Sequence, residues 1–213
     1  MRPDESWVEW LQTRLAEWAP QGIEPEVGDR RAAVCLILRI GERSRSASGP
    51  GDDPSILFVT RAVVDRDPWS GHTAFPGGHI DDRDADLLDT ARRETREEVG
   101  IELPRASFLG RLDDIRPMTR SPSVVVSPFV ARVDGDPRIT RNHEVERHVW
   151  VPERALRDPS LRSEVVLEAP TGTRRYPAIA YGDLTIWGLT HRVVTNFLAV
   201  AGGDILAGAR PEP

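Results

Sequence analysis

The sequence lacks most of the features that mark extracellular, membrane-embedded or nucleic-acid-binding proteins. Cys35 is the only cysteine among 213 residues, so the chain can form no internal disulfide. No apolar run approaches the roughly 18 residues that a membrane helix needs, and the N-terminus has no signal-peptide core. The formal net charge is −6, which leaves no broad basic surface for nucleic acid. We therefore expect a cytoplasmic protein with no nucleic-acid or membrane partner.

The chain also offers no nucleophile of the usual catalytic kinds. Cys35 lies within the apolar run 32–38, where we expect a buried structural thiol rather than a reactive one. The Gly-x-Ser-x-Gly pattern of many serine hydrolases is absent. We therefore expect chemistry without a covalent intermediate.

The most informative stretch is residues 75–101, in which a glycine pair and an acidic loop precede a charged helix. We expect the helix to begin at Asp84 or the residue after it and to end at Val99. Asp84 or Asp86 can cap it, because a short carboxylate accepts hydrogen bonds from the free N–H groups of a first turn. Gly100 can end it, because glycine adopts the left-handed conformation at low cost.

Three glutamates share one face of this predicted helix. Glu94, Glu97 and Glu98 stand at i, i+3 and i+4, and about 3.6 residues per turn bring them together. Carboxylates this close repel one another unless a cation joins them, and hard oxygen ligands suit Mg²⁺ or Mn²⁺. Arg93 stands four residues from both Asp89 and Glu97, so it can hold a glutamate in orientation. The alternative is a solvated, salt-bridged helix face, which is what most charge runs form.

The order and spacing of these residues resemble the Nudix box, Gly-x5-Glu-x7-Arg-Glu-U-x-Glu-Glu-x-Gly-U, in which U is usually aliphatic. The spacing from Gly78 to Arg93 is one residue longer than in the general pattern. Asp84 stands in place of the first glutamate, and Thr95 replaces the aliphatic U. The Gly-Gly-x-x-Asp-x-x-Asp form with the longer loop resembles the coenzyme A pyrophosphatase branch of the family. The matching positions are Gly78, Arg93, Glu94, Glu97, Glu98, Gly100 and Ile101.

This resemblance implies an α/β fold, the Nudix α/β/α sandwich, with a mixed β-sheet between helices in a single domain over residues 1–213. The apolar spacing itself predicts a helix at about 6–18, which either docks on the domain or forms a lid or dimer contact. It predicts another helix at about 187–200, well after the box at about 78–101. Buried or alternating runs predict strands at 31–40, 55–61, 108–112, 123–133, 144–151, 165–167 and 174–179.

The resemblance also implies a metal site and a reaction. Glu94, Glu97 and Glu98 would hold Mg²⁺ or Mn²⁺, together with the carbonyl of Gly78, since a glycine turn lets the backbone approach an ion closely. The cation would neutralise charge on phosphoryl oxygens and lower the pKa of a bound water. Either Glu97 or Glu144 would take the proton of that water. Glu144 matches a Glu-Val pair of the same branch, and a plain surface carboxylate is its alternative.

Four residues are expected to bind the substrate. Arg61, Arg66 and Arg116 can fork onto phosphate oxygens, and Trp69 can line a base or acyl pocket. The alternative for Arg61 and Arg66 is a solvated surface position. We count Arg93 with the catalytic residues, because it would orient the acting glutamate.

The implied enzyme is a pyrophosphatase that acts on a nucleoside diphosphate linked to another group. Coenzyme A or its acyl esters would be the substrate, with 3′,5′-ADP and 4′-phosphopantetheine, free or acylated, as products. The branch usually carries Arg-Ser and a later histidine before the glycines, whereas here Ala62 follows Arg61 and Trp69 stands in the histidine position. The alternatives are the same reaction on ADP-ribose, a nucleotide sugar or a dinucleoside polyphosphate, and a non-catalytic nucleotide-sensing module. The assembly is left open, with a homodimer as one option.

Overall fold

The computed structural model covers the predicted glutamate helix and nearly all the predicted strands. It describes residues 5–41, 54–64, 69–117, 123–169 and 172–202. Arg66, one of the predicted substrate-binding residues, lies outside the described residues. None of the helices in the described ranges is long and apolar enough to cross a membrane.

The central strand of the main sheet is β1, Arg30–Ile40, whose Ala-, Val-, Leu- and Ile-rich sequence suits burial on both faces. It pairs in parallel with β6, Val124–Asp134, over its whole length. One end of β1 pairs antiparallel with β2, Ser55–Arg61, and the other end pairs antiparallel with β4, Gly77–His79. The result is a seven-stranded sheet, and it is mixed, as predicted. Its remaining strands are β3, Thr73–Ala74, β5, Phe108–Arg111, and β7, Val145–Pro152.

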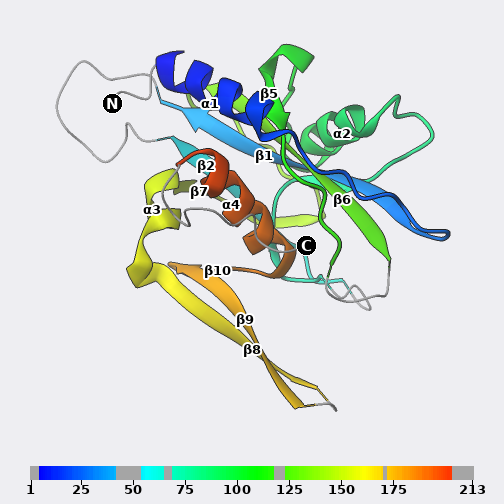
Figure 1. The fold of residues 1–213 in the computed structure, drawn as a ribbon, viewed down its shortest axis with the longest axis vertical. Coiled ribbons are helices and arrows are strands. Elements are labelled where there is room, and N and C mark those ends of the chain that lie inside the picture. The colour runs from blue at the N-terminus through cyan, green and yellow to red at the C-terminus, as the bar shows by residue number, and fades with distance from the viewer. Residues whose placement is uncertain (1–4, 42–53, 65–68, 118–122, 170–171, 203–213) are drawn as a thin grey trace.

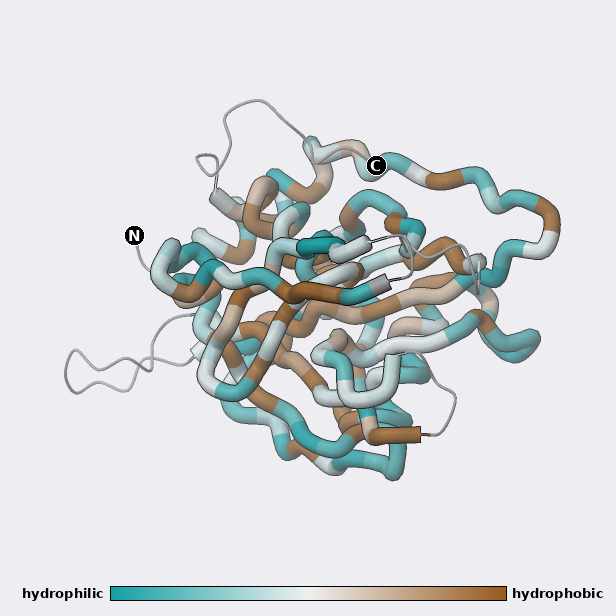
Figure 2. The backbone as a smooth tube through the Cα atoms, turned by 90° about the horizontal axis from the view of Figure 1, so that it is seen from below, coloured by the Kyte–Doolittle hydropathy of each residue, from teal (hydrophilic) through white to brown (hydrophobic). Residues whose placement is uncertain are grey.

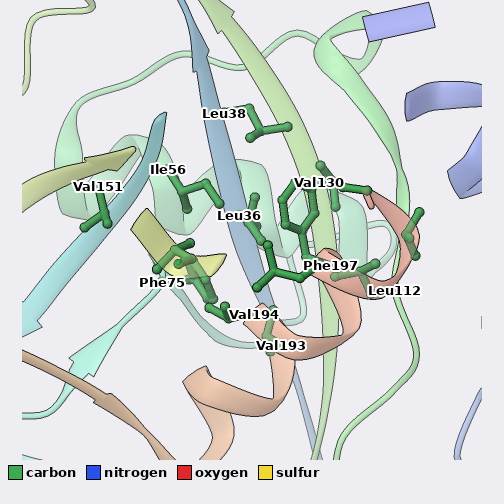
Figure 3. Packing of buried hydrophobic residues seen from close by; sticks show 14 of the residues in the cluster. Leu36, Leu38, Ile56, Phe75, Leu112, Val130, Val151, Val193, Val194 and Phe197 are labelled. Atoms are coloured by element: carbon green, nitrogen blue, oxygen red, sulfur yellow. The ribbon is translucent and has the colours of Figure 1, made fainter. Parts of the chain in front are cut away.

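Helices cover both faces of this sheet. On one face lies α2, Leu87–Val99, and on the other lie α1, Glu5–Trp18, and α4, Gly188–Val200. This arrangement confirms the predicted α/β/α sandwich. Figure 3 shows the layer beneath α4, where Phe197 lies over the sheet, and Figure 2 shows hydrophobic stretches running through the middle of the molecule.

The helix α1 docks on the sheet, as the first of its two predicted roles requires. Val8, Leu11 and Leu15, spaced three to four residues apart, are buried in the same core cluster as α4. The indole N–H of Trp18 donates to Asp113 Oδ1 at 3.0 Å and ties down the end of the helix. The apolar stripe that predicted the helix is therefore the surface by which it packs.

A second, three-stranded sheet follows α3, Glu153–Arg157, and the 3₁₀ turn Pro159–Leu161. It contains β8, Arg162–Ala169, β9, Gly172–Tyr181, and β10, Leu184–Trp187, in the order β10-β9-β8. The β8–β9 hairpin projects away from the main sheet (Figure 1). Both of its strands are longer than the apolar patterns at 165–167 and 174–179 indicated. Cross-strand hydrogen bonding, rather than burial, sets their length.

Candidate active site

The ends of α2 are set by its caps. Asp86 is the N-cap, and its side chain accepts a hydrogen bond from the N–H of Asp89 at 2.8 Å. Gly100 is the C-cap, with a left-handed φ of 74°, as predicted. The helix begins at Leu87, later than predicted, because Asp84 faces inward and does not cap it. Asp86 is therefore the capping residue of the two candidates.

One side of α2 is buried against the sheet. Ala91, Thr95 and Val99 are buried there, and Thr95 lies against the thiol of Cys35. Burial raises the pKa of the Cys35 thiol to about 12, so this thiol stays protonated at neutral pH. Its position agrees with a packing role rather than a nucleophilic one.

Arg93 is the central connecting residue of the site. Its Nε and Nη2 atoms each donate to a different oxygen of Asp84 at 2.9 Å, which is a bidentate ion pair. Its Nη1 atom donates to Glu94 at 2.7 Å and to Glu97 at 3.1 Å. The hydrogen bonds from Arg93 hold the pKa of Asp84 well below its usual range. The expected Arg93–Glu97 pair is thus present, and Arg93 restrains two of the three glutamates.

The expected pairing of Arg93 with Asp89 is wrong. Asp89 instead accepts from Arg92 at 2.8 Å and forms an ion pair with Arg105 at 2.8 Å. The reason is that Asp84, in the loop before the helix, accepts hydrogen bonds from the Nε and Nη2 atoms of Arg93. Spacing along one helix therefore indicated the wrong partner for Asp89, because a loop residue competed successfully for the guanidinium.

The glutamates differ strongly in burial. Only 3% of Glu98 is exposed, and one of its oxygens accepts from the N–H of Gly77 at 3.1 Å. Burial, with smaller contributions from the charges of Glu94 and Glu144, raises the pKa of Glu98 to about 8. Burial also raises the pKa of Glu94, and the charges of Glu97 and Glu144 add to the effect. Burial and the neighbouring carboxylates thus disfavour the charged forms of both glutamates.

The glycine pair before the acidic loop was predicted to form a turn, and this prediction is wrong. The pair instead belongs to the short strand β4. Gly77 and Gly78 pair with Val34 and Ala33 of β1. A Cβ atom at Gly78 would lie 2.4 Å from an oxygen of Glu94, and one at Gly77 would lie 2.3 Å from the carbonyl oxygen of Ala33. Glycine is therefore required here for close approach, and it brings the backbone of Gly78 against the Glu94 carboxylate.

Glu144 reaches the site from a distant part of the chain. It lies directly before β7, and its carbonyl accepts from the N–H of Ala62 at 2.7 Å. Its N–H is held by the side chain of Asn142 at 2.9 Å. Its charge contributes to the raised pKa values of Glu94 and Glu98, so Glu144 lies near the glutamates of α2.

The structure describes three of the four predicted substrate-binding residues, and their surroundings differ. Arg61 ends β2, where its positive charge acts on Glu98, so it belongs to the same site. Trp69 lies in the loop before β3, and its carbonyl accepts from the N–H of His72 at 3.1 Å. Arg116 donates to the side chain of Asp29 at 2.7 Å, so its guanidinium is engaged at the start of β1.

A row of aromatic rings beside Arg61 was not predicted as a unit. The rings of His72 and Trp187 lie 4.9 Å apart, and those of Tyr176 and Trp187 lie 5.9 Å apart. The N–H of Arg61 donates to the carbonyl of His72 at 3.1 Å, so the row starts next to the arginine. No local sequence signal joins these rings, because they come from three separate strands and loops.

The carboxylates of the site are ligands that suit a hard divalent cation, although the described side chains are not arranged as a complete coordination sphere. Among the described residues, no three carboxylate, histidine or cysteine side chains converge closely enough to hold a metal ion. The fit lies in the chemistry, since Glu94 and Glu98 are carboxylates removed from water with too little positive charge nearby. A cation such as Mg²⁺ or Mn²⁺ supplies that charge.

The metal-free protein is expected to lose stability as the pH rises, because of Glu98. Between about 4.5 and about 8 the folded state keeps a proton on Glu98 that the unfolded state has lost. Stability from this group is therefore present at acid pH and lost through that window, by a few kcal/mol at about 1.4 kcal/mol per pKa unit. Glu98→Gln cannot ionise and still accepts from Gly77.

Urea unfolding in the presence of a chelator measures this effect. The variant should be more stable than the wild-type protein at about pH 9, and the difference should shrink at about pH 5. An equal difference at both pH values would exclude titration of Glu98 as its cause.

Comparisons with known proteins agree with this geometry. The model of the NUDIX domain matches residues 29–169. The human mitochondrial coenzyme A diphosphatase NUDT8 is 32% identical over 82% of this chain and 76% of that protein. An uncharacterised protein of Schizosaccharomyces pombe is 32% identical over 76% of this chain, which spans only 54% of that relative.

A solved structure shares the fold. The crystal structure of a MutT/nudix family protein from Enterococcus faecalis has a TM-score of 0.53 and 14% identity, over 93% of this chain and 79% of that one. The domain match, the human relative and the glutamates of α2 all indicate the same family. The chain therefore belongs to the Nudix hydrolase family and is similar to its coenzyme A pyrophosphatase branch.

Proposed function

We propose that this enzyme hydrolyses the diphosphate linkage of coenzyme A or its acyl esters. The products would be 3′,5′-ADP and 4′-phosphopantetheine, free or acylated. The observation that carries the proposal is the glutamate face of α2, where Glu94 and Glu98 are removed from water beside Arg61 and Glu144. The choice of substrate is supported by similarity to the human coenzyme A diphosphatase over most of both chains.

Different residues of the site are proposed to bind the cation and to orient its ligands. Glu94, Glu97, Glu98 and the carbonyl of Gly78 would hold Mg²⁺ or Mn²⁺. The bound cation would neutralise charge on the phosphoryl oxygens and lower the pKa of a water. Arg93 keeps Glu94 and Glu97 in orientation through its hydrogen bonds to both.

The general base is proposed to be Glu97 or Glu144. A base must reach water, and 42% of the Glu97 side chain and 49% of the Glu144 side chain are exposed. Glu98 is too buried to exchange protons easily with solvent. Exposure thus supports both candidates equally, and a substitution experiment must choose between them.

Besides the cation, the positively charged contacts to phosphate would come from arginine side chains alone. The sequence contains no lysine, so all 28 of its cationic Lys and Arg side chains are arginines. Arg61 is the best supported of the predicted contacts, because its charge acts on Glu98. Arg116 would have to leave Asp29, whose side chain is only 3% exposed, before it could bind a phosphate. Arg66 stays a prediction.

The aromatic row is proposed to line the groove for the pantetheine arm. The row begins with His72, whose carbonyl is bound by the N–H of Arg61. The ring of Trp187 contacts the ring of His72, and Tyr176 extends the row onto the β8–β9 hairpin. A row of half-buried rings offers an apolar surface with polar edges, which suits a chain of amides and methylenes. Trp69, which lies in the same loop as His72, would contact the adenine or the acyl group.

The second candidate is the same reaction on ADP-ribose, a nucleotide sugar or a dinucleoside polyphosphate. It is kept because the motif before the glycines departs from the coenzyme A branch at Ala62 and Trp69. A non-catalytic module ranks last, since all three glutamates are retained. A cytoplasmic location remains a prediction, and the human relative is mitochondrial by name.

Product analysis with a substrate panel tests the proposal. We expect coenzyme A to give 3′,5′-ADP and 4′-phosphopantetheine by mass spectrometry, with dephospho-coenzyme A a poorer substrate by roughly ten- to a hundredfold in kcat/KM. That ratio corresponds to one charge-assisted phosphate contact of about 1.5–3 kcal/mol. If ADP-ribose or diadenosine polyphosphates give a much higher kcat/KM, the second candidate stands instead.

A further inference from the structure

The β8–β9 hairpin is an arm whose outer part has no cover in the described structure. Residues 162–169 of β8 pair with residues 172–179 of β9, and β9 pairs on its other edge with β10 over residues 178–181 only, which leaves β8 at the edge of the sheet. Val166 is 45% exposed and Leu167 is 41% exposed, and the facing residues 172–175 are exposed as well. A two-stranded hairpin by itself is marginally stable in water. The arm therefore has apolar surface and a free strand edge available to a partner.

We propose that β8 is a self-association edge, on which the β8 strand of a second copy of this chain pairs antiparallel. An edge strand presents a row of unpaired N–H and C=O groups, and natural proteins usually protect it with proline, a bulge or charged side chains. From 162 to 169, β8 contains no proline, and it pairs with β9 without a register shift. Its charges are of both signs, which leaves pairing with an identical strand open.

Twofold symmetry restricts how two β8 strands can pair. In an antiparallel pair, residues directly opposite each other point to the same face of the sheet. Since the two strands are identical, residues of odd number must face odd and residues of even number must face even. The symmetry axis therefore passes through one residue and its copy. The registers that keep at least five residues of each β8 strand in the ladder have Glu164, Val165, Val166 or Leu167 at the centre.

The charges along β8 select one of these four registers. With Val165 at the centre, Arg162 lies opposite Glu168 of the second copy, and this favourable pair occurs twice. With Val166 at the centre, Glu164 of each copy lies opposite Glu168 of the other, which gives two repulsive pairs. With Glu164 at the centre, the Glu164 side chains of the two copies lie opposite each other. Opposite charges across strands contribute about 0.2–1 kcal/mol each, and like charges cost a similar amount.

The remaining register, centred on Leu167, shortens the ladder and forms no charge pair. The Val165 register keeps seven residues of each strand, 162–168, in the ladder. Within each arm, Thr173 already donates to Glu168 at 2.8 Å, which holds this carboxylate at the end of the strand. The charges and the length of the ladder thus favour one register over non-specific strand pairing.

The dimer should be reversible. One strand of each copy is far fewer than the roughly 20–30 residues per side of a standard stable interface. We therefore expect monomer and dimer to exchange and the dimer fraction to rise with protein concentration. The interface uses the arm alone, so the outcome is independent of the substrate proposal.

Disulfide trapping tests the register. Cys35 is fully buried, so Val165→Cys adds the one accessible thiol of the described residues. On the symmetry axis its Cβ atom would lie about 4.5–5.5 Å from that of its copy, close to disulfide range. We expect mild oxidation to give a covalent dimer much faster than for Thr173→Cys, which lies on β9 away from the edge. Equal rates for the two variants would overturn the proposal.

Charge reversal tests the pairing itself, by sedimentation velocity over a range of concentrations. Arg162→Glu should weaken the dimer about tenfold or more, since it converts two favourable pairs into two repulsive ones. Arg162→Glu combined with Glu168→Arg should restore it. Arg174→Glu carries the same charge change on β9 and serves as the matched control. A wild-type protein that stays monomeric, or a double variant no better than the single one, would overturn the proposal.

Discussion

Turnover is expected to fall below detection when divalent cations are chelated, and to return when Mg²⁺ or Mn²⁺ is added in excess. The physical reason is the uncompensated charge of the site, where Glu94 and Glu98 both have raised pKa values without a cation. A polyanionic diphosphate brings still more negative charge into the same space. Without a cation, neither the binding of the diphosphate nor the build-up of charge during attack is stabilised.

A second readout separates metal binding from catalysis. Thermal unfolding of the wild-type protein should shift upward on addition of Mg²⁺ or Mn²⁺, by about 2.7 kcal/mol of stability at a cation concentration a hundredfold above Kd. Glu98→Gln should show a much smaller shift. Full turnover in excess chelator would rule out metal-assisted hydrolysis, and an unchanged unfolding temperature would rule out a cation site at the glutamates.

Glu97→Gln and Glu98→Gln are each expected to lower kcat by about a hundredfold or more while the fold is kept. Both substitutions preserve side-chain size and an acceptor oxygen, so the bonds from Arg93 and Gly77 can persist. What is lost is negative charge for the cation and, at Glu97, a candidate base. Glu102→Gln, an exposed position just after the helix, is the matched control and should retain near-normal kcat.

Glu144→Gln, measured in the same assay, assigns the general base. A loss of kcat as large as that of Glu97→Gln, with a changed pH profile, would favour Glu144. A small loss would return the role to Glu97. Near-normal turnover in Glu97→Gln or Glu98→Gln would remove that residue from the metal site, whatever the result at position 144.

The parts of the site that the sequence predicted well are local. The end at Gly100, the shared face of Glu94, Glu97 and Glu98, and a cap narrowed to Asp84 or Asp86 all follow from helix geometry within a few residues. The helix α1 was also predicted from local sequence, because the spacing of its apolar residues indicates the stripe that is buried. Short-range hydrogen bonds and periodicity determine such features with little influence from the rest of the chain.

Other features were visible only as isolated residues. Glu144 could be named from its resemblance to a family pattern, but its approach to Glu94 and Glu98 depends on how β7 pairs with β2. Of the two partners predicted for Arg93 within the helix, Glu97 is present, but Asp84 in the loop binds Arg93 with two hydrogen bonds in place of Asp89. Sequence distance says little about such contacts, because closing a longer loop costs only slightly more free energy.

The residue types alone specify which chemistry is available: hard oxygen ligands on one helix face, arginine as the only strong cation, and a single cysteine. The tertiary structure decided which of these groups meet. It placed Gly78 in a strand against Glu94, engaged Arg116 with Asp29, and extended β8 and β9 into an exposed arm. It also raised the pKa of Glu98, because a carboxylate changes its proton affinity only when folding removes it from water.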